Sequence, residues 1–557
     1  MFIIIPQTPQ NYALRIKQHA ERTANLDIRS GVNYRGLAGF LNRPFAEDHR
    51  DATVDVTNPA EPPLVCVKSL VEGGRQTARS YHAVSDCATF EQDPPSLVNK
   101  AAHLVWLQGY PAPEWINAIG AQYRVDPEFF RRHLIFLQSK DNHDFAAMPS
   151  SAQRMLTLRL TTICHTQFAL RQTAIEAARN EATNAVRQHQ QRLRTGDSVV
   201  RKYSVFDNTI FTIDQELAIY VERKKQHNGW IAIVCSDLGK DLTQGPGGLS
   251  SPWLGEEPAS PPACEPVIMH VPKLALKHPH QHRFVNVTSN GSPLMYQNAS
   301  LLADTIDLQS GGDDIYLDVR EALHDVFTLI AAAESQFLTM VQGLVDREIQ
   351  LQSSGKQTEW TLSNLRYFKS SIDDHIVNLE NTLDFLRHPD VPKWAPHTRS
   401  PRALSREGTP AGQAQHSRYR SPQGEAFAEY SRLSSLGDDY TRLLQRATKL
   451  SNRCVENTTI LMNMAMLEES KKAIVQADGL TRLTLLAFFF LPLSLTTSFF
   501  GMNFRELGTG SMHMWVFFVV AVPFLLFSTL LCFWGAVLPN FRGRMQWAWK
   551  MFTSGAR

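Results

Sequence analysis

Residues 483–537 read LTLLAFFFLPLSLTTSFFGMNFRELGTGSMHMWVFFVVAVPFLLFSTLLCFWGAV, and the organisation of the whole chain follows from them. Two apolar runs without a charged residue, 483–500 and 514–538, lie on either side of a short polar segment, 501–513. Each run is long enough to cross a hydrocarbon core of about 30 Å. Two buried helices of a soluble core are the alternative, but two such runs side by side favour a pair of transmembrane helices.

The composition indicates a large water-facing part that carries this small membrane part. The chain has 557 residues, 20% of them charged, and a formal net charge of +2, and its mean hydropathy is −0.24. So small a net charge excludes a bulk electrostatic case for nucleic acid. The seven cysteines are scattered and form no CxxC motif, which argues against a disulfide framework or a zinc ribbon. No P-loop, GxSxG or HExxH motif is present, so we expect no enzyme.

Residues 1–313 are expected to form a cytosolic α+β domain. Segment 1–95 lacks long periodicity and predicts irregular structure with a strand near 63–67. Apolar residues at helical spacing predict helices over 97–107 and 114–119 and another from Asp126 onward, with Pro127 at its first position. Short β-branched runs predict strands, at 209–213, 217–221 and 230–235. We interpret His133 and the histidines of 278–282 as structural or surface residues rather than metal ligands.

From residue 314 onward the pattern predicts long helices. Runs 316–351 and 358–386 indicate an antiparallel pair within a bundle over 314–388. Segment 389–424 is rich in proline and basic residues and is predicted to be a disordered linker, which could touch anionic lipid. A stalk helix over 425–482 then continues into the first apolar run. Its apolar seam predicts packing between identical chains and consists of Leu443, Ala447, Leu450, Cys454, Asn457, Leu461 and Ala465.

The basic residues set the expected topology. Lysines and arginines flank the outer sides of both apolar runs, whereas segment 501–513 holds only Arg505 as a cation and Glu506 as an acid. The positive-inside rule therefore places both chain ends, including the tail 539–557, in the cytosol and the loop outside. We expect an integral membrane protein, with the plasma membrane as its location.

One face of the first run combines hydroxyl, small and apolar side chains at helical spacing. Its members are Ser498, Ser494, Leu491, Ala487, Thr484 and Leu480. Two readings stay open, because the hydroxyls can bond their own helix carbonyls or the face can line water. Two helices cannot enclose a pore, so conduction would require an oligomer around the first run. The face carries no charge, which suits a cation that keeps its water, as magnesium does.

The segment between the runs adds oxygen atoms at its start. Gly501 would let backbone carbonyls approach an ion closely, and Asn503 offers a neutral side-chain oxygen. The carbonyl end of the preceding helix carries partial negative charge, which attracts cations.

Pro492-Leu493, Phe500 and Gly501-Met502-Asn503, placed between two C-terminal spans, resemble the CorA magnesium transporter family. Segments 107–134 and 470–494 resemble its fungal branch. The resemblance implies a homopentameric channel in which a cytosolic α/β domain leads into the bundle and the stalk. It also implies magnesium as the transported ion and as a regulatory ligand. It implies the following roles: Gly501, Met502 and Asn503 as the outer ion filter, Ser494 and Leu491 as pore-facing residues, and Leu480 and Leu483 near the cytoplasmic gate.

Two residues depart from the family pattern. Phe500 stands where the family usually has tyrosine, and Arg505 places a cation beside Glu506 at the outer mouth, where it would oppose cation entry. The leading hypothesis is channel-like passive uptake of magnesium gated by the cytosolic domain. The alternatives are transport of zinc or another divalent metal, and a membrane-anchored cytosolic scaffold or sensor that does not conduct.

Overall fold

The structure, a computed structural model, has two compact units, Met1–Asn457 and Thr458–Arg557, each of which is described by itself. The described residues are 8–22, 28–46, 62–71, 76–93, 101–137, 154–166, 170–224, 229–243, 253, 262–269, 295–306, 308, 319–353, 358–387, 422–500, 505 and 513–530.

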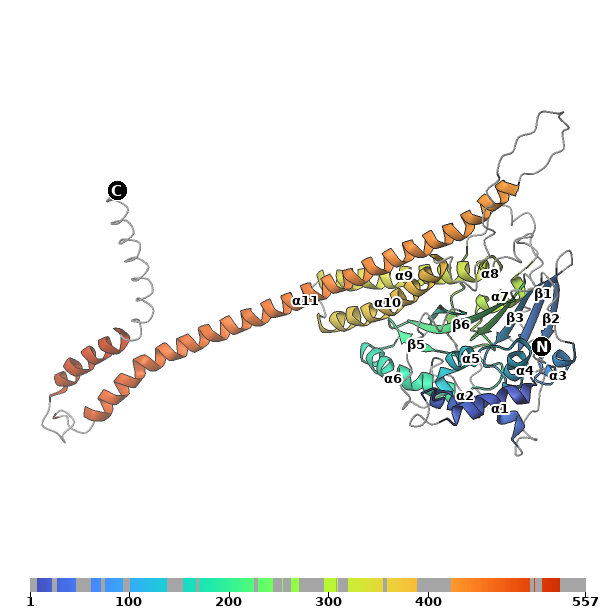
Figure 1. The fold of residues 1–557 in the computed structure, drawn as a ribbon. Helices are drawn as coiled ribbons and strands as arrows, with labels where there is room; N and C mark the ends of the chain where they lie inside the picture. The colour runs from blue at the N-terminus through green and yellow to red at the C-terminus, as the bar shows by residue number, and fades with distance from the viewer. Residues whose placement is uncertain are drawn as a thin grey trace, which may run out of the picture. The chain divides into compact units, whose positions relative to one another are not determined.

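The first unit is built on one mixed sheet of eight strands in the order β2-β1-β3-β7-β6-β4-β8, with β5 paired to β6 (Figure 1). The strands are β1 Val65–Val71, β2 Thr77–Tyr81, β3 Ala101–Gln108, β4 Met155–His165, β5 Lys202–Val205, β6 Ile210–Lys224, β7 Gly229–Ser236 and β8 Ala263–Cys264. The β3–β7 pairing is parallel, and the other pairings are antiparallel.

The centre of the sheet corrects one prediction made from sequence. Residues 101–108 form β3, and the helix predicted over 97–107 is wrong for these residues. Every residue of β3 is buried. A strand covered on both faces loses the alternation of apolar and polar residues, so its apolar run resembles a buried helix. The strands predicted at 209–213 and 217–221 are parts of one long strand, β6.

Helices occupy much of the N-terminal segment for which irregular structure was predicted. They are α1 Pro9–Ala20, α2 Arg35–Leu41 and α3 Cys87–Gln92, with 3₁₀ turns at Val32–Tyr34 and Arg43–Phe45. The helices α2 and α3 are too short to show a helical period. The 12 residues of α1 do place Tyr12, Ile16 and Ala20 on one buried face, but this spacing was missed. Further helices are α4 Pro113–Tyr123, α5 Pro127–His133, α6 Gln172–Gln191 and α7 Leu302–Thr305, with 3₁₀ turns at Ile135–Leu137 and Asn298–Leu301. The predicted start of α5 is confirmed, because Asp126 accepts from the N–H of Glu128 and Pro127 follows it.

The α1 helix is fixed on α4 by a close aromatic contact. A Cβ atom added to Gly120 of α4 would lie 2.5 Å from the ring of Tyr12. The Tyr12 hydroxyl donates to the carbonyl of Val125 over 3.1 Å, and burial raises the pKa of this hydroxyl, which keeps the donated proton in place. Position 120 therefore has room only for glycine.

Long helices pack on the other side of the sheet from α1, α2 and α4 (Figure 1). They are α9 His324–Ser353 and α10 Thr358–Arg387, which confirm the two helices expected there, and the short α8 Val319–Ala322 precedes them in the chain. Both α9 and α10 contact β4. α11, Pro422–Phe500, is a single helix of 79 residues that carries residues of both units.

The seam of α11 is covered within one chain in its first part. Leu443, Ala447, Leu450 and Cys454 are buried. Side chains of α11 around them donate to α9 and α10: Tyr440 to the Phe327 carbonyl over 3.0 Å, Arg446 to Thr339 over 3.0 Å and Ser451 to Asp373 over 2.7 Å. The predicted contact between identical chains is therefore wrong for these four positions, because a heptad-like seam does not reveal whether its partner helix belongs to the same chain.

Candidate metal-ion pathway

The second unit contains the apolar part of α11 and one further helical segment. The stretch Ser435–Phe499 of α11 includes a run that is long and apolar enough to cross a membrane. By the same measure, no other helix of the described residues qualifies, and the second segment, Met514–Leu530, is a shorter apolar helix. The structure thus supports one candidate span directly.

The two apolar helices touch through a small patch. Pro492, Thr496 and Ala521 are buried there, although most of their neighbours are exposed. Pro492 lacks an N–H, so the carbonyl four residues earlier, that of Phe488, has no α-helical donor. The Ser528 hydroxyl of the second helix donates to this carbonyl over 3.2 Å. A carbonyl in hydrocarbon needs such a partner, because no water is available there.

The residues of the predicted pore face lie roughly 80° to 160° around α11 from Pro492, measured by the shorter way. At about 100° per residue, Ser494 is roughly 200° around the helix from Pro492. Leu491, Leu483 and Leu480 are 70%, 62% and 64% exposed. The remaining residues of the face are also exposed: Ser498, Ser494, Ala487 and Thr484. Near its outer end α11 is therefore packed at Pro492 and Thr496, and the predicted face is exposed, as are all the other residues from 480 to 491.

The hydroxyls on this helix behave in two ways. Thr484 donates to the Leu480 carbonyl over 2.7 Å, and Thr497 donates to the Ser494 carbonyl over 2.9 Å. These bonds match the reading in which hydroxyls satisfy their own helix. The hydroxyls of Ser494 and Ser498 have no hydrogen-bond partner among the described residues, so they are the side chains on this face best able to bond to water. That the face lines water stays a prediction.

The predicted filter lies outside the described residues. This holds for Gly501, Met502 and Asn503 and for Glu506 at the outer mouth. Arg505 is described and is exposed to solvent. The described parts of the chain contain no group of three or more His, Cys, Asp or Glu side chains arranged to hold a metal ion. The histidines of 278–282 also fall outside the described residues.

A buried charged cluster, which the sequence did not reveal, lies within the first unit. Arg201 donates two hydrogen bonds to Asp237, over 2.7 and 2.8 Å, and one to Nδ1 of His133 over 3.3 Å. Burial raises the pKa of Asp237 to about 6 although Arg201 lowers it, so the carboxylate is ionised at neutral pH. Burial and Arg201 together lower the pKa of His133, which is neutral. Its structural role, predicted from sequence, agrees with these contacts.

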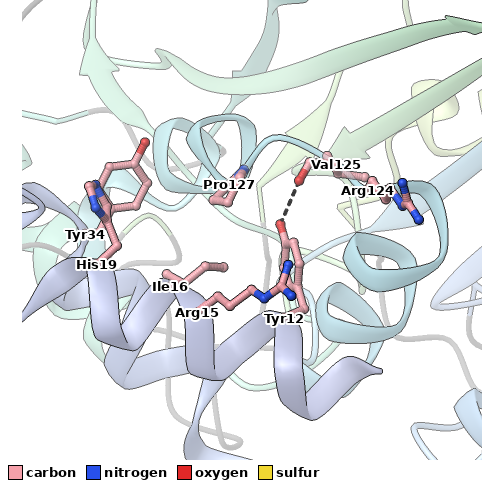
Figure 2. Close-up of a pocket in the computed structure, with 8 residues that line it drawn as sticks. All are labelled: Tyr12, Arg15, Ile16, His19, Tyr34, Arg124, Val125 and Pro127. Carbon is pink, nitrogen blue, oxygen red and sulfur yellow. Dashed lines mark hydrogen bonds between the residues drawn. The ribbon is translucent and has the colours of Figure 1, made fainter. Parts of the chain in front are cut away.

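A pocket with a volume of about 340 Å³ lies beside α1, far in sequence from the predicted pathway (Figure 2). It is lined by Tyr12, Arg15, Ile16, His19, Tyr34, Arg124, Val125 and Pro127. The rings of His19 and Tyr34 meet edge to face at 5.2 Å, and Arg124 ends α4 in a left-handed conformation with φ 54°. None of the site residues predicted from sequence lines this pocket.

Comparison with known proteins identifies the C-terminal part of the chain. Residues 363–535 match the family model described as CorA-like Mg2+ transporter protein. A search of curated proteins finds no match to the chain. The matched range begins within α10 and includes all of α11, the second apolar helix and the glycine–methionine–asparagine tripeptide. The chain thus carries, at residues 363–535, a domain of the CorA-like Mg2+ transporter family.

Proposed function

We propose that the protein moves a divalent metal cation across a membrane through a channel-like pore, with magnesium as the ion. The observation that carries the proposal is the separation of two faces on α11. In the last turns of α11, Pro492 and Thr496 are buried beside the second apolar helix, while Leu491 and Ser494, about 100° and 200° around the helix from Pro492, are exposed. The match of residues 363–535 to the CorA-like family supports the same reading.

The pore requires several copies of the chain. Two helices enclose no channel, so the exposed face of α11 would surround an axis together with the same face of other copies, in a homopentamer. Leu480 and Leu483 would narrow the pore at the cytosolic end and act as the gate, biased by the cytosolic unit and by magnesium bound there. Both chain ends would lie in the cytosol, and the plasma membrane is the proposed location.

The chemistry of the face suits a hydrated ion. Its side chains are hydroxyls, small groups and leucines, and none carries a charge. Magnesium releases its waters reluctantly, so neutral oxygens that bond to its hydration shell favour passage without trapping the ion. At the outer end, Asn503 and the backbone of Gly501 would supply such oxygens and act as the filter together with Met502.

Magnesium influx into liposomes that contain the purified full chain tests the proposal. The native protein is expected to conduct, Asn503→Ala to lose most of the flux, and Asn184→Ala, on the exposed side of α6, to conduct like the native protein. Equal flux for Asn503→Ala would refute the filter. Zinc flux without magnesium flux would favour another divalent metal, and no metal flux would favour a non-conducting scaffold. The mass of the oligomer in detergent tests the pentamer separately.

A further inference from the structure

Two cysteines face each other at the edge of the sheet in the first unit. Cys164 of β4 and Cys264 of β8 are direct register partners, and their Sγ atoms are 3.0 Å apart. Both are free thiols in this structure. Cys164 is fully buried in an apolar cluster, and Cys264 is half-buried against it.

The backbone between the two strands holds this pair at a close spacing. Glu265 donates its N–H to the carbonyl of Ile163 over 2.8 Å, which makes Ile163 and Glu265 a hydrogen-bonded pair. In an antiparallel ladder such pairs alternate with non-hydrogen-bonded pairs, whose Cα atoms are only about 4.5 Å apart. Cys164 and Cys264 are the next, non-hydrogen-bonded pair. This spacing lies within the range of about 4.4–6.8 Å that a disulfide bond requires.

The sulfur separation does not fit a metal site. Two thiolates on one tetrahedral zinc ion, with bonds of about 2.3 Å, lie about 3.8 Å apart. The observed 3.0 Å is shorter, and the described residues around the pair offer no third metal ligand group. A small rotation of the two side chains would instead bring the sulfur atoms to bonding distance.

We propose that Cys164 and Cys264 form a reversible disulfide when the protein meets hydrogen peroxide. The thiolate of Cys264 attacks one peroxide oxygen, and the O–O bond breaks to give Cys264 sulfenic acid and a hydroxide ion, which takes up the proton that the Cys264 thiol had released and becomes water. The Cys164 sulfur then attacks the Cys264 sulfur, the S–O bond breaks, and a second water leaves. Two thiols and one peroxide thus yield one disulfide and two waters. A dithiol reductant restores the thiols.

The order of the two steps follows from exposure. Cys264 is the half-buried partner, so it is the one that peroxide can reach. Burial raises the pKa of Cys164, which keeps this residue a thiol until its partner has been activated. Each cysteine therefore has a distinct role, with Cys264 as the attacking residue and Cys164 as the resolving residue.

The disulfide would fasten a segment that joins the sheet to the helical bundle. β8 has two residues. Beyond it, Val267 exchanges two hydrogen bonds with Asn298, over 2.9 and 2.8 Å. Gln336 of α9 donates to the Pro266 carbonyl over 3.2 Å. Oxidation would therefore add a covalent bond where the sheet edge holds the segment that contacts α9.

Peptide mapping of the purified full chain tests this inference independently of ion flux. After peroxide treatment and alkylation of the remaining thiols, a peptide pair that links Cys164 to Cys264 is expected, and a dithiol should abolish it. Cys264→Ala should lack the linked pair, whereas the matched variant Cys87→Ala, on α3, should keep it. The bond spans 100 residues, so oxidation should raise the melting temperature of the first unit by roughly 5 °C or more, but not in Cys264→Ala.

Two results would overturn the proposal. One is recovery of both cysteines as alkylated thiols at peroxide doses that oxidise a thiol peptide in the same tube. The other is recovery of Cys264 as a sulfinic acid beside an unmodified Cys164, since a nearby resolving thiol would have intercepted the sulfenic acid.

Discussion

Ser528 donates its hydroxyl to the Phe488 carbonyl over 3.2 Å, and this is the carbonyl that Pro492 leaves without a helical donor. The second apolar helix therefore repairs the hydrogen-bond pattern of the first. In a hydrocarbon environment this hydrogen bond stabilises the helix, because no water is present to bond to an unpaired carbonyl. The contact also fixes how the two helices face each other, which leaves the predicted pore face of α11 exposed.

Ser528→Ala is expected to destabilise the helical hairpin by about 0.5–1.5 kcal/mol, which is the range of hydrogen bonds between membrane helices. Unfolding of the detergent-solubilised protein in a denaturing detergent measures this loss. Thr529→Ala is the matched control, because the Thr529 hydroxyl bonds only carbonyls of its own helix, those of Leu525 and Leu526. An equal loss for both variants would contradict the special role of Ser528.

The same bond can be examined with a double-mutant cycle. Pro492→Ala restores an N–H for the Phe488 carbonyl, so Ser528→Ala should cost less in this background than in the native chain. Additive losses would mean that the hydroxyl does not compensate for the proline.

Gly120→Ala is expected to destabilise the first unit by about 1–3 kcal/mol, because its Cβ would lie 2.5 Å from the buried ring of Tyr12. Denaturant unfolding gives the difference. Gly39→Ala in α2 is the control, since an added Cβ there meets nothing within 4 Å, and alanine favours a helix by about 0.5–1 kcal/mol. A loss of stability in both variants would contradict the steric explanation.

Acid is expected to weaken the first unit through His133. Burial lowers the pKa of His133 in the folded chain, so below about pH 6.5 only the unfolded chain takes up its proton. This group should then lower stability as pH drops below this value, by up to about 1.4 kcal/mol per pH unit, whereas Asp237, whose pKa burial raises to about 6, contributes a slope of opposite sign below that pH. Buried His189, whose pKa burial also lowers, adds to the slope of His133.

Unfolding curves recorded between pH 5 and 7 test this slope. His133→Gln should flatten the dependence on pH even if it lowers stability overall, because glutamine can still accept from Arg201. His82→Gln changes an exposed residue and should leave the slope unchanged. Parallel curves for the native chain and His133→Gln would exclude this histidine as a cause.

The proposed pore face predicts a difference between two neighbouring hydroxyl positions. A thiol introduced by Ser494→Cys should react with a small water-soluble thiol reagent, and magnesium flux should then fall. Thr496→Cys places the thiol at a position that is 6% exposed and packed on the second apolar helix, so it should react slowly. Faster labelling at position 496 than at 494 would reverse the assignment of the two faces.

Arg505 is expected to slow cation entry. Arg505→Gln should raise magnesium influx by roughly twofold or more at low ionic strength, and the difference should shrink as salt screens the charge. Glu506→Gln should have the opposite effect, and Arg15→Gln, which changes an exposed residue of α1, should have none. A flux that falls in Arg505→Gln would show that the arginine assists the pathway.

The sequence predicted elements well where local chemistry determines them. Asp126 and Pro127 predict the start of α5. Long runs of apolar residues at helical spacing predict α9 and α10. β3 was misread because full burial removes the alternation that identifies a strand. The sequence predicted the apolar seam of α11 but not the helices that pack on it. An apolar stripe can pack on a helix of the same chain as well as on a second copy of the chain.

For the candidate site, the sequence indicated the face of α11 through its helical spacing. Pro492 also implies an unpaired Phe488 carbonyl four residues earlier. That Ser528 supplies the missing donor could not be predicted, because the register between two apolar helices depends on packing that spacing does not record. The buried pair Arg201 and Asp237 gave no signal either, since isolated charges in a sequence look alike whether they are exposed or buried.

The place of β7 in the sheet has a consequence for biosynthesis. β7 lies between β3 and β6, so the strands made before it form two separate half-sheets, each with an open edge. If translation pauses before Gly229, the backbone hydrogen-bonding groups of those edges stay unpaired and can pair with strands of other chains. Once Ser236 has emerged, the sheet can close while Leu483 is still untranslated, since domains generally fold as units during synthesis. The order of the chain thus lets the water-facing part fold before the apolar helices reach the membrane.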